Sequence, residues 1–256
     1  MRVKMDGNKL LNETDRMRYA RHLSLPGFGE EAQSRLKSGS VLVIGAGGLG
    51  SPVCLYLAAA GVGRIGVMDG DRVDESNLQR QVIHSTADIG MPKVESAARR
   101  MLALNPYVDV ATYDFRFTAD NAMTMLDEYD FVIDATDSIQ AKFLINDMCV
   151  AANKPFSHGA IYRYCGHTMT YKPGSACYRC LFDTMPDPVE TSGPLGVLPG
   201  IIGTIQASEA VKYLAGVGDL LIGSLFTVDT LTMTTARIAV PRRNDCGACG
   251  GFADLM

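Results

Sequence analysis

The chain has 256 residues, of which 47% are hydrophobic and 20% are charged, and its formal net charge at pH 7 is −4. This apolar content can fill a globular core, whereas the acidic balance excludes a general basic field that would hold nucleic acid or an anionic membrane. The sequence has no uninterrupted apolar run of roughly eighteen residues and no apolar stretch behind its first basic residues. We therefore expect a cytoplasmic protein with no nucleic-acid and no membrane partner.

The first part of the chain predicts two helices and then a strand, a tight turn and a third helix. The helices are expected at Asn8–Leu23 and Glu30–Leu36. The apolar run Ser40–Ile44 leads into the glycine-rich loop Gly45–Gly50, and small residues from Leu49 to Ala60 predict the next helix. A second strand, expected to end at Asp69, completes a βαβ unit.

Alternating strands and helices continue to about residue 155. The predicted elements are the strand Arg64–Asp69, a helix from Pro92 to Leu104, a strand at Val108–Tyr113, a buried strand at Asp130–Ala135 and a helix at Ile139–Ala152. This alternation is typical of a doubly wound, Rossmann-like α/β fold whose mostly parallel sheet is covered on both faces.

The pattern changes after Pro155, where later strands, some of them antiparallel, are expected. They are Ser157–Ile161, Cys165–Tyr171, Leu225–Asp229 and Thr235–Val240, with one long helix at Ile201–Leu214. Residues 182–199 include four prolines and two glycines, so they predict a mobile crossing loop. No long polar linker divides the sequence, and we expect one domain over residues 1–256, with amino-terminal helices at 8–37.

The loop after the first strand has the spacing Gly-x-Gly-x-x-Gly. Its glycines are Gly45, Gly47, Gly48 and Gly50. Missing β-carbons permit a tight turn and let backbone N–H groups approach a phosphate at the start of a helix. Taken alone, the motif indicates either a NAD or FAD site, with Asp69 on a ribose hydroxyl, or glycines needed only for packing a helix on a strand.

Polar residues beyond the second strand favour a triphosphate over a dinucleotide. They are Asp71, Asn77, Arg80, Gln81 and Lys93. A triphosphate concentrates about four negative charges, which Arg, Lys and Mg²⁺ neutralise. Asp137 follows the strand at 130–135, at the edge where open α/β sheets bind ligands. It is either a magnesium ligand or the amino cap of the next helix.

The sequence contains seven cysteines, and four of them form two Cys-x-x-Cys pairs, Cys177/Cys180 and Cys246/Cys249. The odd count and the lack of a secretion signal favour reduced thiols. Two pairs fit one structural zinc ion, because four thiolates leave no open coordination position, and a redox pair is the alternative. Cys54, Cys149 and Cys165 are expected to be small buried hydrophobic residues.

These motifs together resemble the MoeB/ThiF/HesA family, the bacterial relatives of ubiquitin-activating enzymes. The resemblance runs from about Arg16 to Gly250 and is carried by Gly-x-Gly-Gly-Leu-Gly, Asp69-x-Asp71, Asn77-Leu78-x-Arg80-Gln81, Lys93, Asp137 and the two cysteine pairs. It implies a single adenylation domain with a nucleotide-binding core at 40–155 and a carrier-binding and zinc-binding half at 156–250. Such an enzyme uses Mg-ATP to adenylylate the terminal glycine of a ubiquitin-like sulfur carrier, ThiS-like or MoaD-like, releasing pyrophosphate in thiamine or molybdopterin biosynthesis.

The resemblance also implies a role for each matching residue. Gly48 and its neighbours would approach the phosphates, Asp69 would bind the ribose, and Asp137 would hold Mg²⁺. Asn77, Arg80 and Lys93 would hold the polyphosphate. Arg21 matches an arginine that the family inserts into the partner subunit's site, so a homodimer is implied. No general base is needed, because a terminal carboxylate is already ionised at neutral pH, and we expect all four histidines to be structural.

One departure from the family concerns sulfur. Many members carry a cysteine in the crossing loop, but the corresponding position here is Val189, and residues 181–199 contain no cysteine. We therefore expect the reaction to stop at the acyl-adenylate and a separate persulfide donor to supply the sulfur. The sequence ends seven residues after Cys249, and we therefore expect no sulfurtransferase domain there.

Three other classes of protein remain as alternatives. A nicotinamide or flavin oxidoreductase would use the same glycine loop, but it would not need Arg80 and Lys93. An ATP-dependent enzyme resembling the tRNA threonylcarbamoyladenosine dehydratase would share the nucleotide site, although two cysteine pairs and an acidic chain are less expected there. A non-catalytic scaffold is disfavoured, because every expected phosphate-binding residue is present.

Overall fold

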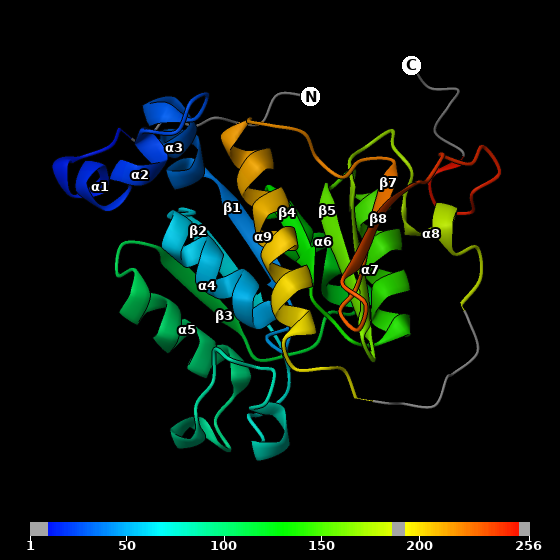
Figure 1. Cartoon of the computed structure of the whole chain (residues 1–256), viewed down its shortest axis with the longest axis horizontal. Helices are drawn as coiled ribbons and strands as arrows, with labels where there is room; N and C mark the ends of the chain where they lie inside the picture. Colours follow the sequence, from blue (N-terminus) through cyan, green and yellow to red (C-terminus); the bar gives the residue numbers. More distant parts are fainter. Residues whose placement is uncertain (1–9, 186–192, 251–256) are drawn as a thin grey trace.

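The computed structural model describes residues 10–185 and 193–250. Their strands are β1 (Ser40–Ile44), β2 (Arg64–Met68), β3 (Asp109–Tyr113), β4 (Phe131–Asp134), β5 (Phe156–Tyr162), β6 (Cys165–Tyr171), β7 (Ser224–Asp229) and β8 (Thr234–Ala239). They form one eight-stranded sheet in the order β3-β2-β1-β4-β5-β6-β7-β8 (Figure 1). The pairings among β1 to β5 are parallel, and those from β5 to β8 are antiparallel. This arrangement confirms the predicted fold class.

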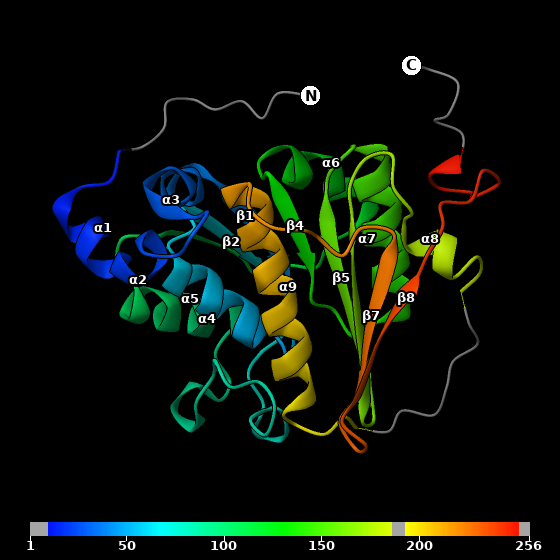
Figure 2. The same ribbon diagram turned by 45° about the horizontal axis from the view of Figure 1, so that its top comes forward.

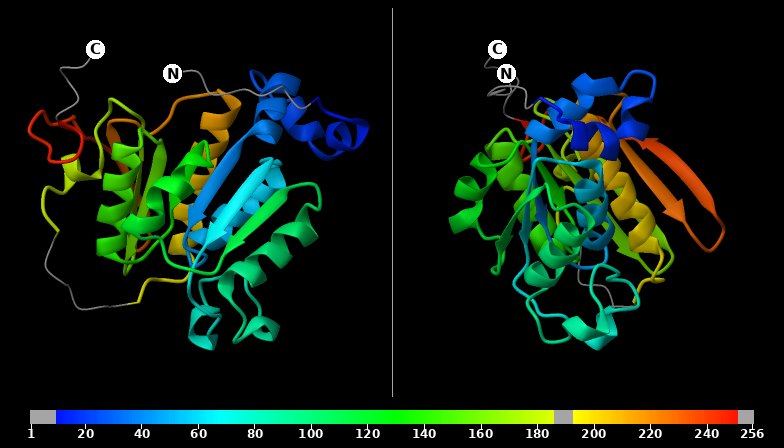
Figure 3. Two further views of the ribbon diagram at one scale, coloured as in Figure 1. Left: turned by 180° about the vertical axis from the view of Figure 1, so that it is seen from behind. Right: turned by 90° about the vertical axis from the view of Figure 1, so that its left-hand side faces the viewer.

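The described helices cover both faces of the sheet. They are α1 (Glu13–Arg18), α2 (Ala20–Leu23), α3 (Gly29–Ser38), α4 (Gly50–Ala60), α5 (Lys93–Leu104), α6 (Ala119–Asp127), α7 (Ile139–Ala151), α8 (Tyr178–Leu181) and α9 (Leu198–Ala215). Because side chains alternate along a strand, Val41 and Val43 of β1 face the core under α3, α4 and α9. Leu42 and Ile44 face the opposite core, under α6 and α7. Figure 2 shows α9 lying across the first face, and the left view of Figure 3 shows α6 and α7 on the other.

The predicted helix Asn8–Leu23 is wrong as a single element. Residues 8 and 9 lie outside the described residues, and the rest forms α1 and α2, separated at Tyr19. Asn12 and Asp15 form a reciprocal capping box that begins α1. Tyr19 is buried, and its hydroxyl oxygen would lie only 2.3 Å from a β-carbon on residue 61, so only glycine fits there. The chain therefore turns at Tyr19 to place this ring in the core.

Two boundaries and one helix also differ from the predictions. The long helix begins at Leu198 rather than Ile201, and Pro199 fits its first turn because the N–H groups there have no intrahelical partner. Pro92 is the amino cap of α5 rather than part of its first turn. Helix α6 was not predicted, although Thr118 and Asn121 form a capping box.

The predicted crossing loop is described only in part. Residues 186–192 lie outside the described residues, while the backbone N–H of Leu195 donates to the carbonyl of Arg163, 2.9 Å away. This bond attaches the end of the loop to the β5–β6 turn before α9 begins. In the described part of the chain, none of the helices combines the length and hydropathy required of a bilayer-spanning segment.

Candidate functional site

The candidate site lies at the carboxyl ends of β1 and β4, where the strand order reverses. The glycine loop follows β1, and residues 134–137 follow β4. Gly45 has a φ of +103°, and a β-carbon there would lie 2.6 Å from the Ala135 carbonyl oxygen. A β-carbon on Gly50 would lie 2.0 Å from the Gly45 oxygen. These two glycines are therefore required for the loop to pass so close to its neighbouring backbone.

Asp69 and His84 hold the glycine loop from two sides. The backbone N–H of Ala46 donates to Asp69 Oδ2 at 2.8 Å, and Asp69 Oδ1 accepts from the Asp71 N–H at 2.8 Å. His84 bonds through Nε2 to the Ala46 carbonyl at 2.9 Å and through Nδ1 to Ser96 Oγ at 2.8 Å. Burial lowers the pKa of His84, so a neutral ring donates from Nε2 to the carbonyl. Asp69 keeps acceptor capacity for a hydroxyl, as its predicted ribose contact requires.

The Asp71 carboxylate forms ion pairs with two cationic side chains. Lys93 is buried and its Nζ lies 3.2 Å from Asp71 Oδ2, while Arg116 Nη2 donates to Asp71 Oδ1 at 3.0 Å. Burial alone would raise the pKa of Asp71, but Lys93 and Arg116 outweigh it and lower that pKa. The predicted residue Asp71 thus orients Lys93. Sequence analysis missed Arg116, which reaches this place only because β3 pairs with β2.

A short turn brings the other predicted polar residues to the glycine loop. The N–H groups of Arg80 and Gln81 both donate to the Asn77 carbonyl, at 3.1 and 2.9 Å. A β-carbon on Gly48 would lie 3.5 Å from Arg80 Cγ, so this arginine stem runs beside the loop. Gln81 is buried next to Gly47, and its Oε1 has no hydrogen-bond partner among the described residues. Such an unpaired amide beside a phosphate-type loop is a position for a ligand group.

Asp137 is exposed, and the structure corrects one interpretation of it. Ser138, not Asp137, caps α7, because the Ala141 N–H donates to Ser138 Oγ at 3.3 Å. Within the described residues, the Asp137 carboxylate has no hydrogen bond or ion pair. Its carboxylate oxygens are therefore able to bind a cation, as a magnesium ligand requires, on the β4 side of the glycine loop, whereas Arg80 and Lys93 follow β2 on the other side.

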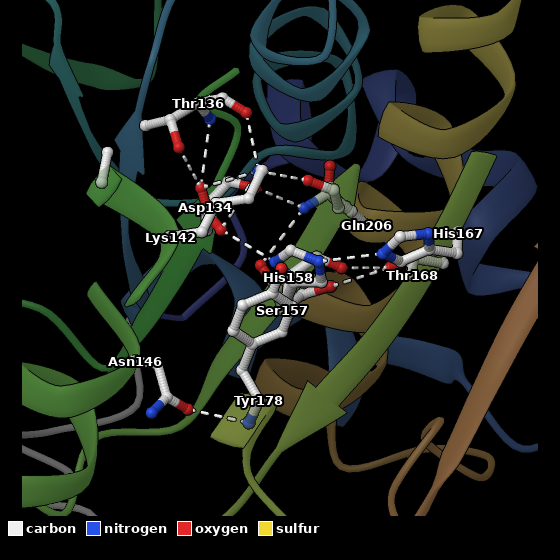
Figure 4. A network of polar contacts seen from close by, with 12 residues as sticks. Asp134, Thr136, Lys142, Asn146, Ser157, His158, His167, Thr168, Tyr178 and Gln206 are labelled. Atoms are coloured by element: carbon white, nitrogen blue, oxygen red, sulfur yellow. Dashed lines mark hydrogen bonds and ion pairs between the residues drawn. The ribbon is translucent and has the colours of Figure 1, made fainter. Parts of the chain in front are cut away.

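Behind the loop that follows β4 lies a buried network of charged and polar side chains that sequence analysis did not predict (Figure 4). Asp134 is fully buried, and its Oδ2 accepts from His158 Nδ1 at 2.9 Å. The Nζ of Lys142 lies 3.4 Å from both Asp134 oxygens. Burial would raise the pKa of Asp134, but Lys142 and His158 lower it to about 2. Asp134 therefore stays ionised inside the protein.

Two histidines extend the network toward β6. The Nε2 atoms of His158 and His167 lie 3.3 Å apart. Burial lowers the pKa of both rings, for His167 to about 3, so both are neutral at pH 7. The charged and titratable groups that face His158 are Asp134, Lys142, His167 and Tyr178.

Acid should destabilise this protein well before its carboxylates titrate. The folded pKa values of His84, His158 and His167 lie below the ordinary 6.5, so the unfolded chain binds protons that the native one does not. The stability due to the neutral rings is present above pH 6.5 and is lost as the pH falls. We expect the free energy of unfolding to drop between pH 7 and pH 5. The slope is about 1.4 kcal/mol per pH unit for each proton that the unfolded chain binds and the native chain does not.

Urea denaturation at pH 7, 6 and 5 measures this slope. In the variant His167→Gln, the slope of the free energy of unfolding against pH should be smaller by the contribution of about one proton. Equal stability of the wild type at pH 7 and pH 5 would contradict the expectation.

The four cysteines of the two Cys-x-x-Cys pairs meet in space. Their Sγ atoms all lie within 4.8 Å of one another, with Cys177 and Cys246 3.6 Å apart and Cys180 and Cys249 3.4 Å apart. A tetrahedral zinc ion with Zn–S bonds of about 2.3 Å needs sulfur separations of about 3.8 Å, and a disulfide needs about 2.05 Å. The backbone N–H of Arg243 also donates to Cys180 Sγ at 3.4 Å, as around bound thiolates. This donor set fits zinc.

Arg21, predicted to act at the nucleotide site, lies away from the glycine loop of its own chain. It is exposed on α2, next to Tyr19, which packs on Gly61 just before β2 begins. Helix α2 therefore lies at the amino edge of the sheet, whereas the glycine loop lies at the carboxyl edge (Figure 1). Cys165 is also not buried as predicted, but exposed on β6.

Comparisons with known proteins agree on one family. The ThiF family model matches residues 19–248. A sulfur carrier protein adenylyltransferase of Thermus thermophilus is 45% identical over 244 residues, covering 91% of this chain and 90% of that protein. The SAMP-activating enzyme E1 of Haloferax volcanii is 44% identical over 245 residues, covering 94% of this chain and 91% of that protein.

A longer protein and a solved structure are also similar. The adenylyltransferase and sulfurtransferase MOCS3-1 of Zea mays is 47% identical over 244 residues, which are 91% of this chain but only 51% of that protein. A crystal structure of E. coli MccB with AMPCPP and MccA has a TM-score of 0.83 and 23% identity, covering 93% of this chain and 75% of that chain. At this identity the likeness concerns the fold.

Proposed function

This chain belongs to the ThiF family, and on that basis we propose that it is an adenylyltransferase that uses ATP to activate the terminal glycine of a ubiquitin-like sulfur-carrier protein. The observation that carries the proposal is the placement of Arg80 and the Lys93–Asp71 pair on one side of the glycine loop and of Asp137 on the other. Cations and a divalent-metal ligand around one loop suit a triphosphate better than a nicotinamide or flavin dinucleotide.

The proposed reaction joins two anions. An oxygen of the carrier's terminal carboxylate forms a bond to the α-phosphorus of ATP, the bond from that phosphorus to the β-bridging oxygen breaks, and pyrophosphate leaves with the electron pair. The nucleophile is already ionised, so no residue has to remove a proton. Arg80 and Lys93 lower the repulsion, and the loop glycines let backbone N–H groups approach the phosphates. Asp137 would hold magnesium bound with ATP, and that ion would supply further neutralisation of the polyphosphate.

The test is isotope exchange between pyrophosphate and ATP with purified carriers ending in Gly-Gly. We expect exchange that needs both Mg²⁺ and a carrier, and none with a carrier that lacks its last glycine. A ThiS-like carrier and a MoaD-like carrier, tested separately, assign the enzyme to thiamine or molybdopterin synthesis. Exchange with neither, together with turnover of NADH or of a modified tRNA, would replace this proposal by one of the two alternatives.

We also propose that the sulfur comes from a separate persulfide donor. Val189, which stands where many family members have cysteine, lies outside the described residues. Cys165 is the one exposed cysteine among the described residues, so it is the thiol to test for covalent capture. A reducible conjugate between enzyme and carrier that disappears in Cys165→Ser would overturn this part of the proposal.

The placement of Arg21 leads to a prediction about a homodimer. Because helix α2, which carries Arg21, lies at the opposite edge from the glycine loop of the same chain, we propose that Arg21 acts in the site of a partner subunit. Arg21→Ala and Asp137→Ala should each be inactive in exchange. Mixed and allowed to exchange subunits, they should recover about one quarter of the wild-type rate, because half of the dimers are mixed and each of these has one intact site. No recovery in verified mixed dimers would count against donation across the interface.

A further inference from the structure

We infer that Lys142 is a positioning residue for the proposed magnesium ligand Asp137. This inference rests on the proposed function and deepens it. Lys142 comes from the second turn of α7 and is 4% exposed. Its ammonium donates to the carbonyl oxygens of Thr136 at 2.7 Å and of Gly159 at 2.5 Å, and it pairs with Asp134. One side chain thus joins the loop after β4 to β5 (Figure 4).

The loop that carries Asp137 has no regular structure, so these contacts define its path. Residues 135–138 are neither helix nor strand. On one side of Asp137, Thr136 is held by Lys142 through its carbonyl and by Asp134 Oδ1 through its N–H and its hydroxyl, at 3.1 and 2.7 Å. On the other side, Ser138 is held as the cap of α7. The backbone that carries the exposed Asp137 carboxylate is therefore held on both sides.

The rest of the network holds Lys142 and Asp134 themselves. His158 donates to Asp134, and Gln206 Nε2 donates to the Asp134 carbonyl at 2.8 Å and to the Ser157 carbonyl at 3.2 Å. Gln206 lies on α9, whose first turn packs against Gly48 through Pro199. The same helix therefore contacts both the glycine loop and the strand end before Asp137.

A buried ammonium is an expensive way to stabilise a fold, because removing it from water costs about as much as its ion pair returns. It does give direction, because its donors must point at fixed acceptors. The Lys142 ammonium donates two hydrogen bonds to the carbonyls of Thr136 and Gly159. These bonds are thus better explained by positioning of the loop that carries Asp137 than by stabilisation of the fold.

The test compares Lys142→Met with a matched control, Lys154→Met. Lys154 is a half-buried lysine whose Nζ likewise donates to a backbone carbonyl, that of Tyr129 at 2.5 Å, but it lies after the carboxyl end of α7. The measured quantity is the gain in ATP affinity that Mg²⁺ brings, obtained by calorimetry with Mg²⁺ and with EDTA. We expect Lys142→Met to need an about tenfold or higher Mg²⁺ concentration for half of this gain, as for other residues that orient metal ligands.

Lys154→Met should stay within about twofold of the wild type, and Lys142→Arg should restore part of the effect. If Lys142→Met does not fold, the variant Thr136→Val is used in its place to test the inference. It removes only the hydroxyl bond to Asp134 and should raise the Mg²⁺ requirement about threefold.

Unchanged Mg²⁺ dependence in a folded Lys142→Met, or in Thr136→Val where the former does not fold, would overturn the inference. Calorimetry needs no carrier, so the two proposals can fail separately. A wild type that binds Mg-ATP but exchanges pyrophosphate with no carrier contradicts the proposed function, while the comparison of variants still decides the role of Lys142.

Discussion

Replacing Arg80 by alanine should lower the rate of ATP–pyrophosphate exchange by about 10²–10³-fold, the usual cost of removing one preorganised charge-stabilising donor. Arg80 is suited to this role because its backbone is fixed by the turn at Asn77 and its stem runs beside Gly48. The attack of a carboxylate on a phosphate gathers negative charge, and a nearby guanidinium lowers the barrier to it. The loss should fall mainly on the maximal rate, while the structure and stability stay close to those of the wild type.

Arg72 provides a matched control for this prediction. It belongs to the same excursion between β2 and α5, and its Nη1 donates to the Gly90 carbonyl at 3.0 Å, as Arg80 Nη1 donates to the Ser76 carbonyl at 3.3 Å. Arg72→Ala should keep the exchange rate within about twofold, because Arg72 is exposed and, among the described residues, its side chain bonds to the Gly90 carbonyl and not to the glycine loop. Equal losses in the two variants would show that the loop needs its arginines for folding rather than for chemistry.

The parallel core could be predicted because its strands are short continuous apolar runs between helices. Val41 to Ile44 and Phe131 to Ile133 are buried on both faces of the sheet, so their sequences carry a strong signal. The glycine loop, Asp69 and Asp137 could be placed because parallel strands end at one edge. The N-terminal region was harder, since the break at Tyr19 depends on a pocket beside Gly61 that no local pattern records.

The residues that support the site could not be predicted for a similar reason. A lysine such as Lys142 in a helix is typical of a solvated surface, and only the pairing of β4 with β5 brings the Gly159 carbonyl to it. Arg116 depends in the same way on β3 lying beside β2, where the Asp69 N–H donates to the Tyr113 carbonyl at 3.1 Å. The sequence therefore predicts the residues that would meet the ligand, whereas the residues that orient them could be found only from the sheet order.

Loss of one cysteine of the cluster should destabilise the protein strongly. We propose that the four thiolates bind one structural zinc ion, and binding of such an ion contributes about 10–16 kcal/mol in zinc-finger peptides. For Cys246→Ser we expect the loss of bound zinc and a decrease of at least about 4 kcal/mol in the free energy of unfolding. Atomic absorption and urea denaturation measure the two quantities, and Cys165→Ser, whose thiol is exposed and outside the cluster, should change neither.

Apart from the cysteines, the segment after β8 is attached by the buried Val240, whose N–H donates to the Gly223 carbonyl at 2.8 Å, and by an ion pair between Arg243 and Asp183. That ion pair is largely exposed, and exposed pairs contribute about 0–1 kcal/mol, so we expect a large loss when a cysteine is removed. On the other side of the cluster, Cys177 precedes Tyr178, whose ring lies 4.3 Å from that of His158. Without zinc, proteases should cleave first within residues 240–250, and the packing of Tyr178 on the network behind Asp137 should loosen. A wild type that contains no zinc and is unaffected by chelators would contradict this assignment and favour a redox role for the cysteine pairs.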